Sequence, residues 1–295
     1  MSEEKKSSGM AAVIAVYLVA IGVFIAVYVV SDAGSVLRRT FVADIGATLV
    51  VFLASVFANN SSVYDPYWSV LPPVMFVTWL IDLGQVTLFA LIILAVTLIW
   101  GTRLTLNWAT SWSGMGQEDW RYRSFRARFG RLYWPVSLLA IHLFPTVSVF
   151  LGCIPVYFVL TEGIVSVPIA GLATLVTAVA VYIEATADIQ LRRFKAEGGE
   201  GPCTVGLWRF SRHPNYLGEL GFWLGLLLFG LAAGAPWWSL AGMAVMVGIF
   251  AGYSIPAMER KITATRPSYR IIQEAVPVLV PIPGRYLLPE DERAV

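Results

Sequence analysis

The sequence predicts an all-α, polytopic membrane protein with about seven transmembrane helices, and three observations support that fold class. Hydrophobic residues make up 57% of the 295 residues and charged residues only 14%. Mean hydropathy is +0.70. This composition is too apolar for a soluble domain of that length. Several runs of about 18 or more residues are almost free of charge, which is the length a helix needs to cross a bilayer.

The seven expected spans follow one another along the chain, separated by polar or by glycine- and proline-containing segments. They cover residues 10–30, 41–57, 71–100, 134–160, 163–190, 217–231 and 237–257. The first run is too long for a signal peptide and lacks a small-x-small cleavage site, so we expect an uncleaved helix. The third run is longer than the ~30 Å hydrocarbon core, so we expect it to tilt or break. A break would add an eighth span and disturb the alternation of charge, so we favour seven.

Basic residues predict the orientation of these spans. Arg38 and Arg39, the arginine-rich segment 101–132, residues 192–212 and the C-terminal tail alternate with three loops that contain no Lys or Arg. Those loops are 58–70, 161–166 and 233–236. The positive-inside rule then places the N-terminus outside and the C-terminus in the cytoplasm, with only Lys5 and Lys6 in disagreement. We expect a multi-pass protein of a bacterial inner membrane.

The most polar stretch beside an apolar run is residues 208–219, with the sequence WRFSRHPNYLGE. Its polar side chains are Arg209, Ser211, Arg212, His213, Asn215, Tyr216 and Glu219. Pro214 is well tolerated in the first turn of a helix, and the N–H groups of that turn favour an anion. Upstream, Asp188, Arg192 and Lys195 are spaced i, i+4 and i+7 and therefore share one helix face. These groups suit a phosphate-bearing nucleotide, although a cluster of ion pairs that only anchors the helix to lipid headgroups has the same composition.

Three motifs resemble one family. The run Arg-His-Pro-Asn-Tyr-x-Gly-Glu, after an apolar helix and a glycine-rich turn, resembles the C-terminal signature of the membrane steroid 5-alpha-reductase family. Arg103-Leu-Thr-Leu-Asn107-Trp108 and Glu118-Asp119-Trp120-Arg121-Tyr122 resemble its bacterial branch, long a domain of unknown function. Together the motifs cover residues from about 100 to 285. The resemblance implies a seven-helix reductase that takes a hydride from NADPH and saturates a carbon–carbon double bond conjugated to a carbonyl.

The resemblance also implies roles for individual residues. Asn215 and Tyr216 match the pair at the nicotinamide, and Glu219 matches a carboxylate of the same motif. The further cofactor positions are Asp188, Arg192, Lys195, Arg212, His213, Arg103 and Asn107, with Lys195 standing where the steroid enzymes have Arg. Arg212 and His213 follow the sterol-reductase form of the motif. Glu259 stands where the family has Tyr.

The N-terminal half departs further from the family, which polarises the enone carbonyl with a Glu and a Tyr: Trp100 or a neighbour stands where that Tyr would be expected, and no matching Glu is evident. Hydride addition builds negative charge on oxygen, so a proton or hydrogen-bond donor is needed. The candidates are Tyr64, Tyr67, Asp82 and His142. Each has a structural alternative: aromatic loop residues anchor proteins at the interface, and Asp82 or His142 can serve a contact between helices. A carboxylate within a span costs ~2.5–3.5 kcal/mol, so Asp82 needs a pocket or a partner.

Two other function classes compete with reduction. Membrane methyltransferases of the isoprenylcysteine and phospholipid type share Arg-His-Pro-x-Tyr-x-Gly and use it to hold S-adenosylmethionine. A non-catalytic lipid-binding or transport protein is the third class. Under the reductase interpretation, residues 1–100 form the substrate side and residues 101–295 the cofactor side. The substrate is a lipid-like small molecule; we expect no metal, since Cys153 and Cys203 lack metal-ligand spacing, and neither nucleic acid nor a protein partner.

Overall fold

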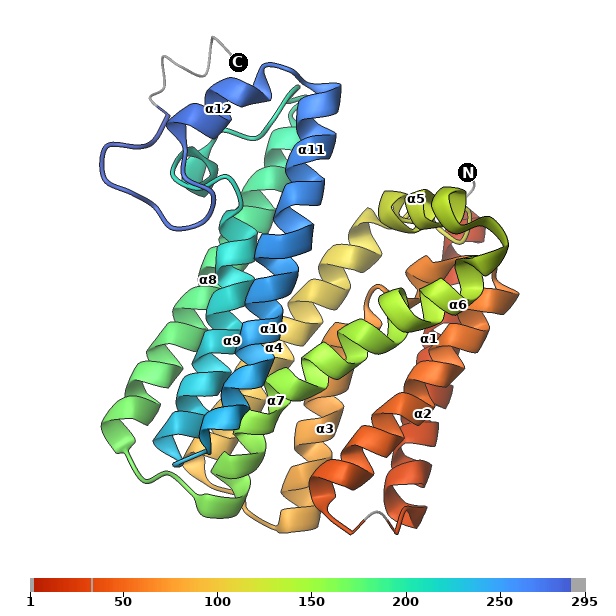
Figure 1. The fold of residues 1–295 in the computed structure, drawn as a ribbon, viewed down its shortest axis with the longest axis vertical. Coiled ribbons are helices and arrows are strands. Elements are labelled where there is room, and N and C mark those ends of the chain that lie inside the picture. Colours follow the sequence, from red (N-terminus) through yellow and green to blue (C-terminus); the bar gives the residue numbers. More distant parts are fainter. Residues whose placement is uncertain (1–2, 33, 288–295) are drawn as a thin grey trace. The chain divides into compact units, whose positions relative to one another are not determined.

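The computed structural model describes residues 3–32 and 34–287, and within these ranges it contains helices and no β-strand. Seven of the helices are long and apolar enough to cross a membrane. The all-α membrane class is therefore confirmed. The chain divides into two compact units, Met1–Gly163 and Ile164–Val295 (Figure 1). The boundary expected after residue 100 falls inside a helix of the first unit, Leu88–Ser111.

The first unit is built from antiparallel helices. Its elements are α1 (Glu3–Val30), α2 (Val36–Phe57), the 3-10 turn η1 (Ser61–Tyr64), α3 (Tyr67–Leu83), α4 (Leu88–Ser111), α5 (Trp120–Phe129), the 3-10 turn η2 (Gly130–Leu132), α6 (Tyr133–Ser137), the π-helical segment η3 (Leu138–Leu143) and α7 (Phe144–Glu162). Helix α1 packs along α2, and α3 packs along both α4 and α7.

The long third run breaks into a hairpin of α3 and α4. Gly84 ends α3 with φ 65°, a left-handed conformation that glycine adopts without strain, and its N–H donates to Leu80 O at 3.0 Å. Thr87 then caps α4, since its hydroxyl accepts from the N–H of Ala90 at 3.2 Å. Farther along the hairpin, a Cβ on Gly101 would lie 2.4 Å from Ser69 O, so the two helices approach each other too closely for a larger residue.

This hairpin overturns part of the predicted topology. The amide of Asn60 donates to Met115 O at 2.8 Å, so the loop after α2 touches the segment between α4 and α5. Gly9, near the start of α1, lies against the side chains of Trp112 and Met115. The loop 58–70, the N-terminal end of α1 and the arginine-rich segment therefore share one end of the unit. The prediction that placed the N-terminus outside and this segment inside was wrong, because it counted α3 and α4 as one span.

Residues 101–132 were expected to be a hydrophilic loop, but they are largely helical. Helix α4 continues to Ser111, and α5 begins at Trp120 after Asp119, whose carboxylate accepts from the N–H of Arg121 at 2.8 Å. From Trp120 to Glu162 the chain forms one membrane-spanning candidate of 43 residues. Its π-helical segment lies just before Pro145, which has no N–H to donate to the preceding turn.

The second unit is a helical bundle with a cap at one end. Its elements are α8 (Val167–Ala196), the 3-10 turn η4 (Gly206–Arg209), α9 (Pro214–Ala232), the 3-10 turn η5 (Trp237–Leu240), α10 (Ala241–Ile249), the π-helical segment η6 (Phe250–Ser254), α11 (Ile255–Thr265) and α12 (Tyr269–Ala275). Of the described helix pairs, α8 and α9 have the most extensive contact. Small residues permit it: a Cβ on Gly218 would lie 2.5 Å from Cβ of Glu184, and one on Gly221 would lie 2.8 Å from Cβ of Ala180.

The chain after α12 returns to the N-terminal end of α9. The N–H of Arg212 donates to Pro277 O at 3.0 Å, and the N–H of His213 donates to Val278 O at 3.2 Å. Leu287 then donates its N–H to Arg209 O at 3.2 Å. A small core formed by Tyr269, Ile272, Val276 and Leu287 lies beneath this segment. The start of the polar motif 208–219 is therefore hydrogen-bonded to the chain that follows α12.

Candidate functional site

The predicted cofactor motif forms the first turns of α9. This helix begins at Pro214, with His213 in the N-cap position, three residues before the expected span. Asn215 and Tyr216 are half-buried, and Glu219, one turn further, is buried. The indole N–H of Trp223 donates to Oε1 of Glu219 at 2.8 Å, which fixes the carboxylate within the helix. The motif therefore has the geometry of an anion-binding helix N-terminus with an amide side chain in its first turn.

Glu259 of α11 organises the cations beside this helix. Its Oε1 lies 3.1 Å from Nε2 of His213 and 3.2 Å from Nε of Arg212. Its Oε2 accepts from the amide of Gln273 at 3.0 Å. Burial raises the pKa of the neighbouring Tyr269 phenol, and the Glu259 carboxylate raises it further, so this phenol stays protonated. The residue that departs from the family pattern thus pairs with the side chains of Arg212 and His213 and accepts a hydrogen bond from Gln273.

This cluster gives Arg212 and His213 a partner within the protein. Both were expected to meet a cofactor directly, yet in the structure both contact the Glu259 carboxylate. The His213 ring also stacks on Tyr216, with ring centroids 5.3 Å apart and an angle of 9° between the planes. The contacts hold His213 and Tyr216 in fixed positions. The sequence showed Glu259 as a departure and gave no means of pairing it with residues 46 positions away.

The face predicted on α8 lies on a continuous helix. Asp188 is buried at 8% exposure, whereas Arg192 and Lys195 are exposed toward the end of the helix. Asp188 lies one turn beyond Glu184, against which Gly218 of α9 packs. The structure therefore brings the acidic end of this face to the start of α9, with two cations beyond it. Arg103 and Asn107 lie one turn apart on α4, in the first unit, and are half-buried.

In the first unit, Tyr67 is paired with a residue that the predicted site did not include. The Tyr67 O–H donates to Oδ1 of Asp44 at 3.1 Å, and both residues are 1% exposed. Thr48 lies 3.4 Å from the same phenol oxygen and 3.0 Å from the hydroxyl of Thr146, which in turn lies 2.9 Å from the Tyr64 hydroxyl. A carboxyl, two phenols and two hydroxyls thus form one buried hydrogen-bonded chain. The signal in the sequence was a lone carboxylate inside an apolar span, which has a functional role by default.

Asp82 does not belong to this chain of polar groups. It is next to last in α3, where it forms an ion pair with Arg39 and accepts from the Tyr28 hydroxyl at 3.0 Å. Fifteen residues of the same helix separate it from Tyr67, which is about 22 Å at the usual rise. The prediction that placed Asp82 in the middle of a span was wrong, because the helix ends at Leu83. Of the two expectations for Asp82, a pocket or a partner, the structure shows a partner, Arg39, at the end of the helix bundle.

His142 has the role of a contact between helices. It is fully buried in the π-helical segment, with Nδ1 2.9 Å from Ser137 O and Nε2 3.2 Å from the hydroxyl of Ser55 on α2. Its ring lies 4.9 Å from that of Tyr64, between centroids. Of the two alternatives for this residue, the described contacts are those of the helix-to-helix hydrogen bond. His142 also lies beside Tyr64, at one end of the buried series of hydrogen-bonded groups.

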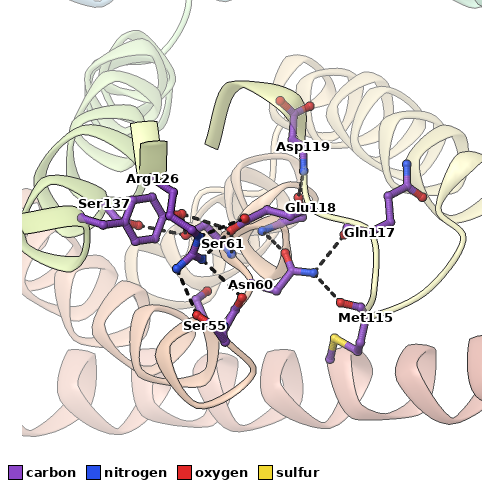
Figure 2. A network of polar contacts seen from close by, with 12 residues as sticks. Ser55, Asn60, Ser61, Met115, Gln117, Glu118, Asp119, Arg126 and Ser137 are labelled. Carbon is purple, nitrogen blue, oxygen red and sulfur yellow. Dashed lines mark hydrogen bonds and ion pairs between the residues drawn. The ribbon is translucent and has the colours of Figure 1, made fainter. Parts of the chain in front are cut away.

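A second polar network closes the arginine-rich end of the first unit (Figure 2). Glu118 accepts from Arg126 at 3.0 Å, from the Tyr133 hydroxyl at 3.1 Å and from the N–H of Ser61 at 3.0 Å. Next to it, Asp65 accepts from the Tyr122 hydroxyl at 2.6 Å. Burial raises the pKa of Asp65 to about 6, although the Tyr122 hydrogen bond opposes the change. The network fastens η1 and the residues after it to the α4–α5 connection, which is a structural role.

A surface hollow and groups of metal-ligating side chains are the other places where a ligand could bind. A hollow of about 430 Å³ between α2 and α7 is open to the exterior and lined by Leu37, Arg38, Phe41, Val42 and Phe150. None of the predicted site residues lines it. Among the described residues, no group of three or more His, Cys, Asp or Glu side chains is arranged to hold a metal ion.

Comparison with known proteins gives the family. The model of a family described as "Protein of unknown function (DUF1295)" matches residues 51–276. The chain belongs to the DUF1295 family. It is similar to Uncharacterized protein C594.04c of Schizosaccharomyces pombe, with 28% identity over 77% of this chain and 74% of the yeast protein. No solved structure matches the chain. The DUF1295 region contains Tyr67, Asp188, Asn215, Glu219 and Glu259, and it begins after Asp44.

Proposed function

We propose that this DUF1295 protein is an integral-membrane, NADPH-dependent reductase that saturates a carbon–carbon double bond conjugated to a carbonyl in a lipid. The observation that carries the proposal is the buried Asp44–Tyr67 pair. The resemblance to membrane steroid 5-alpha-reductases implies a carboxyl group and a phenol from the N-terminal half at the substrate carbonyl. Tyr67 was one of the donors predicted from the sequence, and in the structure the Asp44 carboxyl group lies beside it.

At the substrate end, the pair supplies the hydrogen bond that the reaction needs. Hydride addition to the β-carbon places negative charge on the carbonyl oxygen, and a donor aimed at that oxygen stabilises it. In the structure the Tyr67 O–H donates to Asp44. A carbonyl oxygen that displaces Asp44 as the acceptor would receive the same hydrogen bond, and before the substrate binds Asp44 keeps the phenol oriented. Tyr67 is therefore the proposed donor, and Asp44 is a positioning residue.

At the cofactor end, the first turn of α9 and the α8 face are the proposed binding residues. NADPH, when bound, supplies the hydride. Asn215 and Tyr216 would lie at the nicotinamide, as the resemblance implies, with Tyr216 held by its stacking on His213. Arg192 and Lys195 are exposed and suit the phosphates. Arg212 already faces Glu259, so we assign it to positioning His213 rather than to the phosphates.

The membrane orientation is part of the same proposal. In each unit the basic residues are concentrated at one end: residues 121–131 in the first unit, and residues 192–212 with the C-terminal tail in the second. The positive-inside rule assigns these ends to the cytoplasm, where the nucleotide is available. The N-terminal end of α1 shares the basic end of the first unit and is therefore cytoplasmic in this proposal. The bacterial inner membrane remains the predicted membrane.

Thermal unfolding of purified protein separates reductase from methyltransferase. A ligand that binds only the folded state raises its stability by about 2.7 kcal/mol at a hundred times its Kd. Cys153 and Cys203 are buried thiols, so a thiol-reactive fluorogenic dye reports unfolding. NADPH should raise the midpoint, and S-adenosylmethionine should not. The reverse pattern identifies a methyltransferase, and a response to neither ligand contradicts both enzyme classes.

Matched variants locate the cofactor site in the same assay. Asn215→Ala and Glu219→Gln should lose most of the NADPH-induced shift while their unfolding without ligand stays cooperative. Gln85→Ala, an exposed position in the α3–α4 turn, is the control and should keep the full shift. A full shift in both α9 variants would show that NADPH binds elsewhere.

A further inference from the structure

The segment after α12 exposes a run of apolar side chains. Val278, Val280, Ile282 and Tyr286 are all exposed, Val280 to 63%. Tyr286 lies against Phe210, itself exposed, with ring centroids 5.7 Å apart. Prolines at 277, 281 and 283 restrict the backbone, and Ile282 pairs with Arg285 across a turn at Gly284, whose φ is 77°. A contiguous apolar surface of this kind marks a site of interaction.

The hydrogen bonds of this segment place it beside the start of α9. His213 and Arg212 donate their N–H groups to Val278 O and Pro277 O, and Leu287 donates to Arg209 O. Helix α9, which starts at Pro214, is one of the membrane-spanning helices. The segment therefore lies at the level where α9 enters the hydrocarbon (α12 and the following loop stand at this end in Figure 1). At that level the apolar phase available to exposed Val and Ile side chains is the bilayer interface, where Tyr is also enriched.

The charge of the surrounding chain favours an anionic surface. Residues 257–287 contain five basic residues, Arg260, Lys261, Arg266, Arg270 and Arg285, against two acidic ones, Glu259 and Glu274, which gives a formal charge of +3, and residues 288–295 add three acidic residues and one basic residue. Glu259 is already engaged by Arg212 and His213. Basic residues near an anionic leaflet are attracted to its surface. Apolar side chains flanked by cations are the pattern of a segment that lies in the headgroup region.

We infer that residues 278–286 are an interfacial anchor that inserts Val278, Val280, Ile282 and Tyr286 into an anionic leaflet. The anchor has a second consequence, because the carbonyls of Pro277 and Val278 hold the backbone at the start of α9. Lipid contact at the anchor therefore stabilises the conformation of Arg212 and His213. The inference concerns lipid and does not depend on the reaction proposed above.

Spin labels measure the depth of the segment directly. Val280→Cys and Ile282→Cys are labelled separately in protein reconstituted in nanodiscs, with unmodified protein as the blank because Cys153 and Cys203 are buried. Collisions with O2, which concentrates in hydrocarbon, are compared with collisions with a water-soluble Ni(II) chelate. Leu175→Cys, exposed on α8, is the lipid reference, and Glu200→Cys is the water reference.

We expect both labels to favour O2 over the chelate, as Leu175→Cys does. Chelate accessibility equal to that of Glu200→Cys would place the segment in water and overturn the inference. Protection from both reagents would show that protein covers the segment and would overturn it equally. The O2 preference of Ile282→Cys should increase when phosphatidylglycerol is added to phosphatidylcholine nanodiscs, and Arg270→Gln should reduce the increase. An O2 preference unaffected by the anionic lipid would contradict the charge component.

Discussion

Replacing Gly218 by alanine tests how closely α8 and α9 must approach. The added Cβ would lie 2.5 Å from Cβ of Glu184, 2.7 Å from Ala180 O and 2.8 Å from Glu184 N. Carbon atoms in favourable contact lie about 3.5–4.0 Å apart, so α9 must withdraw from α8 by roughly 1 Å. Two of these atoms belong to the α8 backbone and cannot rotate away. Overpacking of this kind costs about 1–3 kcal/mol.

The matched control is Gly171→Ala on α8, where an added Cβ meets no atom within 4 Å. Unfolding is followed in detergent by the reactivity of the buried Cys153 and Cys203 thiols. Gly218→Ala should lower the free energy of unfolding by about 1–3 kcal/mol, whereas Gly171→Ala should leave it unchanged or raise it slightly, because alanine favours the helix. Equal stability of the two variants would refute the close packing described for this pair of helices.

Three further predictions concern the first unit. Tyr67→Phe should abolish reduction and cost about 1–3 kcal/mol of stability, because the buried Asp44 carboxyl loses its hydrogen-bond donor; unchanged turnover would remove Tyr67 from the site. Asp65 has a folded-state pKa of about 6, above its ordinary value of 3.8, so the free energy of unfolding should fall by up to about 3 kcal/mol as pH rises from 4 to 6. Asp65→Asn should flatten that profile, and a profile equal to that of the unmodified protein would exclude Asp65 as its source. The partly exposed Arg39–Asp82 pair should contribute less than about 1 kcal/mol, so Asp82→Asn should cost little, and a larger loss would show that the pair is structural.

Much of the fold follows from the sequence because hydrophobic runs report helices directly. The starting positions of the spans were harder to predict, since polar residues such as those before Phe41 and Leu217 continue helices beyond the hydrocarbon. The break at Gly84 decided the topology. A single glycine in an apolar run is compatible with a kinked helix or with a turn, and its positive φ is visible only in the structure.

The candidate site was predictable where its residues share one helix. The Asp188–Lys195 face and the Asn215–Glu219 turn depend only on helical spacing, and both lie on continuous helices. The contacts of Glu259 with His213 and of Asp44 with Tyr67 join residues 46 and 23 positions apart. Such pairs depend on how helices pack, which no local pattern in a single sequence specifies. His142 and Asp82 were ambiguous for the same reason, because only packing separates a pocket group from a contact between helices.

Transfer of labelled hydride from the cofactor to a lipid tests the proposed reduction. Protein reconstituted with a lipid extract of its own source is incubated with NADPH carrying tritium at C4 of the nicotinamide, and the lipid fraction is counted. We expect tritium in a lipid C–H bond with the unmodified protein, and none with Tyr67→Phe or Asn215→Ala. Lipid that acquires no tritium from NADPH but acquires methyl groups from S-adenosylmethionine would contradict the proposed reduction.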